Sequence, residues 1–156
     1  MKKAIVFSTI SGQTEKLAKV ILDKVGEVDY YGVPSEEALN ADVIYVGCWT
    51  QAFTCPPNIK DFLEKLNGKK VFLFMTAGYN SSDIYFAPIM QSVKANINTT
   101  NEIIGEFICQ GAVSPQKQEA IKKMDIEKYN NMKEQLDLSQ MHPDAGDIEK
   151  LIEKIK

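Results

Sequence analysis

The stretch FSTISGQT, residues 7–14, joins an apolar run to an amphipathic segment. KKAIV precedes it and EKLAKVILDKV follows it, so a short buried strand leads through a polar turn into a helix. That succession is the opening of a βαβ unit in a parallel sheet. Five of the eight residues carry a hydroxyl or amide side chain and none is a lysine, so the turn is also a candidate site.

Working outward, further apolar runs alternate with helical patterns and predict five parallel strands. The runs in 4–7, 42–49 and 70–76 are nearly continuous, as expected for central strands covered on both faces. The runs in 28–33 and 103–111 are interrupted by polar residues or glycine and are expected at the edges.

Helices are predicted between the strands and after the last one. The predicted ranges are 14–25, 35–39, 56–66, 86–96 and 147–155. Residues 112–146 have helical pieces but few apolar stripes, and we expect a surface excursion there. No linker rich in Pro, Gly or Ser divides the chain, so residues 1–156 are expected to form one domain.

The composition argues against several kinds of partner. The net charge is −3 with a pI of about 5.3, and the basic residues are all lysines, so the clustered cationic surface typical of nucleic-acid binding is not expected. No run approaches the roughly 20 apolar residues of a membrane span. Three widely spaced cysteines favour neither a disulfide framework nor a metal site, and we expect a reducing, cytoplasmic location.

The single histidine and the three cysteines are each expected to have a structural and not a catalytic role. His142 is expected in a turn or cap before the last helix and not as a catalytic or metal-binding group. Cys48 and Cys109 lie in strands and are expected to be inert small hydrophobes. Cys55 follows a strand and is expected to be exposed.

Ligands of an open parallel sheet bind outside the carboxyl ends of its strands. The loops in question are 8–14, 48–57 and 76–86. The first offers four hydroxyls, an amide and the N-terminus of a helix, which together can hold an anion such as a phosphate. The alternative is that one hydroxyl caps the helix, with Glu15 favouring the helix dipole.

The first loop is neither a Walker loop nor a dinucleotide fingerprint, because it lacks their lysine and glycine spacing. STISGQT instead resembles the phosphate loop of flavodoxins, and the resemblance extends over the whole chain in strand number and loop placement. It implies a doubly wound α/β fold with five parallel strands in the order 2-1-3-4-5, and FMN at the point where that order reverses.

The resemblance also implies roles for the other two loops. Trp49 and Phe53 would cover a face of the flavin ring and Thr50 would donate a hydrogen bond, although Trp49 is equally interpretable as a strand-end core residue. Gln51 lies where many flavodoxins have a stacking aromatic residue, a departure that leaves one ring face open to question. Small and aromatic residues of the third loop would meet the ring's other edge. The predicted FMN-binding residues are Ser8, Thr9, Ser11, Gly12, Gln13, Thr14, Trp49, Thr50, Gln51, Ala52, Phe53, Ala77, Gly78, Tyr79 and Asn80.

The function implied is electron transfer by FMN between a donor and an acceptor protein, with no catalytic side chain and a monomer or weak dimer. One alternative is an NAD(P)H-dependent reductase acting on a quinone or another small molecule, so whether the protein is an enzyme stays open. Another is an interaction module that kept the fold and lost the flavin.

Overall fold

The molecule is built around a parallel five-stranded sheet. The computed structural model describes residues 1–10, 12–78 and 82–155. Neighbouring strands pair in the order β2-β1-β3-β4-β5, and every pair is parallel, as predicted. The strands are β1 (Lys3–Phe7), β2 (Tyr30–Gly32), β3 (Val43–Trp49), β4 (Lys70–Ala77) and β5 (Glu102–Gln110).

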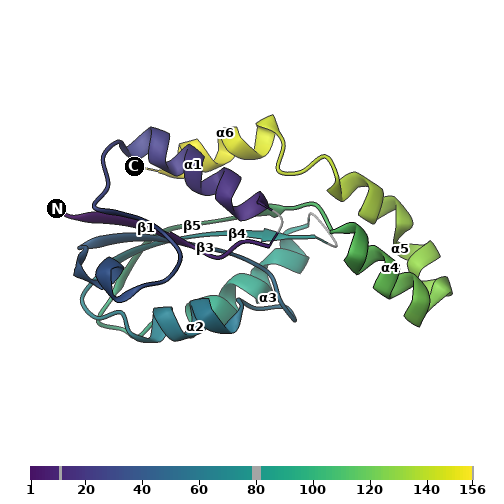
Figure 1. Cartoon of the computed structure of the whole chain (residues 1–156), viewed down its shortest axis with the longest axis horizontal. Helices are drawn as coiled ribbons and strands as arrows, with labels where there is room; N and C mark the ends of the chain where they lie inside the picture. Colours follow the sequence, from purple (N-terminus) through teal and green to yellow (C-terminus); the bar gives the residue numbers. More distant parts are fainter. Residues whose placement is uncertain (11, 79–81, 156) are drawn as a thin grey trace.

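Helices cover both faces of this sheet. Helices α1 and α6 lie on one face and α2 and α3 on the other, while α4 and α5 project beyond the carboxyl ends of the strands (Figure 1). The helices of the described residues are α1 (Gln13–Val25), the 3₁₀ helix η1 (Glu36–Asn40), α2 (Pro57–Glu64), α3 (Asp83–Lys94), α4 (Pro115–Met124), α5 (Ile126–Ser139) and α6 (Ala145–Lys154).

Alternating side chains of the central strands build a core on each face. On β3, Val46 packs in one buried cluster with Ile59 of α2. Its neighbour Tyr45 points to the opposite face and packs with Leu17 of α1 and Leu151 of α6. The nearly continuous apolar strands therefore reflect burial on both sides.

The predicted strand positions are confirmed, with β2 and β5 at the edges, but several helix predictions need correction. Helix α3 begins at Asp83, three residues before its predicted start, because the Ser82 hydroxyl accepts a hydrogen bond from the Tyr85 N–H and so caps it. Most of residues 112–146 form a hairpin of α4 and α5, where the sequence predicted helical pieces in a surface excursion. Its pattern was weak because α4 has no buried residue.

No helix within the described residues combines the length and the apolar character needed to cross a membrane.

Candidate functional site

A cavity of about 590 Å³ lies at the carboxyl ends of the strands. The loops after β1, β3, β4 and β5 contribute to its wall, and the α4–α5 hairpin adds a further side. Its described lining residues are Thr9, Ile10, Gln13, Thr14, Trp49, Thr50, Ala52, Phe53, Thr76, Ala77, Gly78, Tyr85, Gly111, Ala112, Val113, Ser114, Lys117, Ile121, Lys128 and Met132.

The loop after β1 leads into the N-terminus of α1, which no side chain of the described residues caps. The Thr9 hydroxyl accepts a hydrogen bond of 2.9 Å from the Gly12 N–H, which closes the turn. Gly12 is the N-cap of α1, has a φ of 86° that favours glycine, and supplies no side-chain cap. The first N–H groups of α1 have no partner within the helix, so they remain donors for an anion.

Thr14 is the second distinctive feature of this loop. Its side chain is fully buried, and its hydroxyl has no hydrogen-bond partner among the described residues. Leaving a buried hydroxyl unpaired costs about 1–3 kcal/mol. Because Thr14 also lines the cavity, an acceptor atom bound there would remove that cost.

The loop after β3 contains a tight two-residue turn. The backbones of Gln51 and Thr54 exchange hydrogen bonds of 2.8 and 3.0 Å. The intervening Ala52 and Phe53 have φ angles of 50° and 63°, which are unfavourable for residues other than glycine. The turn holds the Phe53 ring 65% exposed, with an edge contact to Tyr85 at a centroid distance of 6.3 Å.

Two residues just before this turn face the cavity. Thr50 donates a hydrogen bond of 2.8 Å to the Thr76 carbonyl, so its hydroxyl proton is engaged with the neighbouring strand. Trp49 is partly buried, and the Lys117 ammonium lies 5.9 Å from the centroid of its ring. Trp49 is thus the last residue of β3 and also lines the cavity, so its ring is a candidate flat surface there.

The loop after β4 approaches the start of the hairpin closely. A side chain at Gly78 would place its Cβ 2.5 Å from Val113 Cγ2, so glycine is required for this packing. The Gly78 carbonyl accepts a 3.2 Å hydrogen bond from Gln110 Nε2. Tyr79 and Asn80 were also predicted here, and they lie outside the described residues.

The structure brings most of the predicted site residues to one cavity, although their contact with a cofactor stays a prediction. The cavity is lined by Thr9, Gln13, Thr14, Trp49, Thr50, Ala52, Phe53, Ala77 and Gly78. Ser11 lies outside the described residues, and Ser8, Gly12 and Gln51 do not line the cavity. The Ser8 hydroxyl instead accepts a 3.3 Å hydrogen bond from Asn58, and Gln51 belongs to the turn described above.

Sequence reasoning missed the contribution of the hairpin. Ser114, Ile121 and Met132 line the cavity together with Lys117 and Lys128. The available signal was the end of β5, since the loop after that strand reaches the same edge of the sheet. The weak apolar pattern of the hairpin concealed it.

The prediction that Cys55 is exposed is wrong. Its side chain is buried, with an exposed fraction of 4%, because it packs in the apolar cluster that also contains Ile59 and Phe62 of α2. Burial raises the pKa of the Cys55 thiol, and burial also raises the pKa of Cys48 and Cys109. None of the three is thus disposed to act as a thiolate nucleophile.

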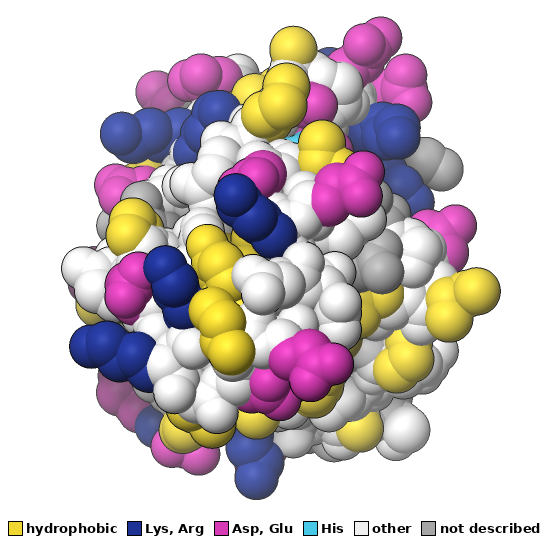
Figure 2. Space-filling model, turned by 90° about the vertical axis from the view of Figure 1, so that its right-hand side faces the viewer, with side chains coloured by type: hydrophobic (Ala, Val, Ile, Leu, Met, Phe, Trp, Pro, Cys, Tyr) yellow, Lys and Arg dark blue, Asp and Glu magenta, His cyan; other side chains and the backbone are white. Residues whose placement is uncertain are grey.

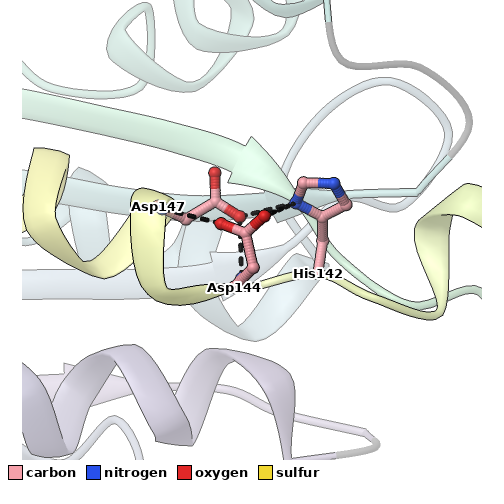
Figure 3. A group of neighbouring side chains, drawn as sticks. All are labelled: His142, Asp144 and Asp147. Atoms are coloured by element: carbon pink, nitrogen blue, oxygen red, sulfur yellow. Dashed lines mark hydrogen bonds and ion pairs between the residues drawn. The ribbon is translucent and has the colours of Figure 1, made fainter.

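A separate cluster of titratable groups lies before α6, formed by His142, Asp144 and Asp147 (Figure 3). Asp144 and Asp147 exchange backbone-to-carboxylate hydrogen bonds of 2.9 Å and form a capping box. His142 Nδ1 lies 2.6 Å from Asp147 Oδ2, and the Asp147 N–H holds the pKa of Asp144 below its usual value. Potential ligand atoms of the three residues lie within 4.8 Å of one another, which sequence reasoning did not foresee, and the capping box accounts for the positions of Asp144 and Asp147.

Comparisons with known proteins agree with this architecture. A family model described as the flavodoxin domain matches residues 4–156. The chain is 32% identical over 162 residues to the flavodoxin-like domain-containing protein BilS of Clostridioides difficile (strain CD3), covering 95% of this chain and 90% of that relative.

Solved structures give the same result for the fold. The structure of two-electron reduced flavodoxin from Megasphaera elsdenii is 28% identical, with a TM-score of 0.54 over 68% of this chain and 84% of its own. A flavodoxin of Streptococcus pneumoniae TIGR4 is 22% identical, with a TM-score of 0.56 over 88% of this chain and 99% of its own. With a family match over nearly its whole length, the chain belongs to the flavodoxin domain family.

Proposed function

We propose that the protein binds FMN in the cavity at the carboxyl edge of the sheet and transfers electrons between redox partner proteins. The observation that carries this proposal is the fully buried Thr14 hydroxyl, which has no partner among the described residues and lies at the N-terminus of α1. Together they form a neutral site for the terminal phosphate of a flavin mononucleotide.

The residues of the cavity fit such a ligand in chemical type. Thr14, Gln13 and the first N–H groups of α1 would hold the phosphate without a salt bridge. Trp49 offers a flat surface for the ring, and Phe53 is an exposed aromatic side chain at the rim. When bound, the flavin supplies the redox chemistry, and the protein supplies orientation, partial exclusion of water and electrostatics.

The surface around the cavity supports a protein as the exchange partner. Ile10 and Phe53 line the cavity and are 70% and 65% exposed, so apolar side chains lie at its mouth. The end of the molecule that carries the hairpin shows apolar side chains between lysines and acidic residues (Figure 2). Mixed charge of this kind suits transient docking of a protein better than binding of a polyanion.

A second candidate is an NAD(P)H-dependent flavin reductase acting on a small molecule. One observation favours it: the α4–α5 hairpin extends the wall of the cavity beyond the loops of the sheet. A nicotinamide or a small acceptor would need such added surface. No arginine is available for a nucleotide phosphate, because the chain contains none.

Anaerobic mixing of the FMN-loaded protein with NADH or NADPH separates the two candidates. The electron-carrier proposal predicts that the yellow flavin stays oxidised on the timescale of turnover and is reduced when a chemical reductant is titrated in. Prompt bleaching by either nicotinamide would instead support the reductase. A colourless protein that takes up no FMN would contradict both and leave a fold that has lost its flavin.

A further inference from the structure

The cavity has a positive electrostatic character that the charge of the whole chain does not suggest. Its described wall contains two charged residues, Lys117 and Lys128, and no carboxylate. The chain as a whole has a net charge of −3. Both lysines come from the α4–α5 hairpin, which places them opposite the loops of the sheet (Figure 1).

Hydrogen bonds fix the start of the hairpin against the sheet. The Gly111 N–H donates to the Ala77 carbonyl at 3.0 Å, which ties this segment to the end of β4. The buried Val113 donates its N–H to Ser139 Oγ at 3.2 Å, and Ser114 caps α4 by accepting from the Lys117 N–H. Lys117 therefore lies in the first turn of an anchored helix.

The Lys117 ammonium lies on the aromatic side of the cavity. Its Nζ is 5.9 Å from the centroid of the Trp49 ring, the flat surface assigned above to the flavin. A cation at such a position acts on the charge of a bound ring, because electrostatic attraction is strong in a partly water-excluded site and declines with distance.

We propose that Lys117 raises the reduction potential of the flavin by stabilising the negative charge of its reduced form. This inference rests on the proposed function. Two electrons from the reduced donor protein, which is thereby oxidised, and one proton from solvent would convert the neutral ring into a reduced ring with one negative charge, while Lys117 remains protonated. The cation interacts favourably only with the reduced ring, so it shifts the equilibrium toward reduction.

The same hairpin contains a matched control for this effect. Lys122 also lies over an aromatic ring, with its Nζ 5.7 Å from the centroid of Tyr129. It belongs to α4, as Lys117 does, but it does not line the cavity. Loss of a lysine that merely stacks on a ring of the hairpin is thus separable from loss of a lysine that lines the cavity.

The test is the midpoint potential of the FMN-loaded protein, measured by equilibration with a reference dye, for wild type, Lys117→Gln, Lys117→Arg and Lys122→Gln. We expect Lys117→Gln to lower the ratio of reduced to oxidised flavin at a fixed solution potential about tenfold, or about 30 mV for a two-electron couple. Lys117→Arg should stay near wild type because it keeps the charge. Lys122→Gln should have no effect.

Salt and affinity provide two further readouts. The difference between wild type and Lys117→Gln should shrink as ionic strength rises, since charges near solvent are screened. A purely structural role would weaken binding of oxidised and reduced FMN equally and leave the potential unchanged.

An unchanged potential in Lys117→Gln would overturn the inference while leaving FMN binding intact. An equal shift in Lys122→Gln would also overturn it, by showing a general effect of charge. If wild type takes up no FMN, the proposed function fails and this inference fails with it.

Discussion

Thr14 shows how one residue can link folding to binding. It occupies the first turn of α1, where a threonine hydroxyl would ordinarily find a local acceptor or solvent, yet it is buried and has no partner among the described residues. Buried polar groups of native proteins are nearly always paired. An unpaired one beside a helix N-terminus is therefore best explained by a ligand.

Replacing Thr14 with Val tests that explanation, because the two side chains have nearly the same shape. We expect FMN affinity to fall about tenfold to hundredfold, as expected for loss of a hydrogen bond to a charged group. The free energy of unfolding without ligand should stay the same or rise by about 1 kcal/mol, since the unpaired hydroxyl is gone. Calorimetric titration and urea unfolding measure the two effects.

Thr99→Val serves as the control. Thr99 is exposed in the turn before β5, at the amino end of that strand, and it does not line the cavity. It should leave FMN affinity unchanged. A Thr14→Val protein that is markedly less stable but binds FMN normally would contradict a ligand-holding role for the hydroxyl.

Residue patterns predicted the site unevenly. The polar turn in 8–14 was predictable from the sequence. It lies between an apolar run typical of a strand and an amphipathic segment typical of a helix, so its hydroxyls were expected at the helix N-terminus. The hydrogen bond between Ser8 and Asn58 did not follow, since it joins the loop after β1 to helix α2, far away in the sequence. The burial of Cys55 depends in the same way on the helix packed against it.

At the level of the element, the turn between Gln51 and Thr54 holds two residues in an unfavourable backbone conformation. Ala52 and Phe53 both have positive φ angles, and such conformations cost of the order of 1–2 kcal/mol per residue when glycine is absent. Strained residues of this kind often cluster at ligand sites. The turn lies at the mouth of the cavity and holds Phe53 there.

Ala52→Gly should relieve part of this strain. We expect the free energy of unfolding to rise by about 0.5–1 kcal/mol, because the gain at positive φ exceeds the entropy that glycine adds to the unfolded chain. FMN affinity should not improve, since the turn that holds Phe53 becomes less constrained. Urea unfolding and flavin titration provide the two values.

Ala87→Gly gives the comparison for that change. Ala87 is exposed in helix α3, where glycine should lower stability by about 1 kcal/mol. If Ala52→Gly destabilises the protein by a similar amount, the turn is not strained in the way described.

The elements themselves were predictable to different degrees. β3 and β4 could be identified because their apolar runs are buried on both faces. The α4–α5 hairpin could not be assigned a role, because α4 buries none of its residues and its importance lies in the surface that it turns toward the cavity.

At the scale of the whole molecule, parallel strand order brings distant segments to one edge. The loops after β1, β3 and β4 lie at that edge because all strands are parallel, and the reversal of strand order between β1 and β3 opens a crevice there. That convergence was predictable from the sequence. The shape of the cavity was not, because its outer wall comes from the hairpin.

The central claim is that this cavity holds a flavin by its phosphate, and paired calorimetric titrations with FMN and riboflavin test it most directly. The two ligands share the ring and the ribityl chain and differ in the phosphate. We predict that FMN binds about a hundredfold more tightly than riboflavin, because only FMN engages Thr14 and the N-terminus of α1. Equal affinity for both ligands, or no heat on mixing with FMN, would contradict the account.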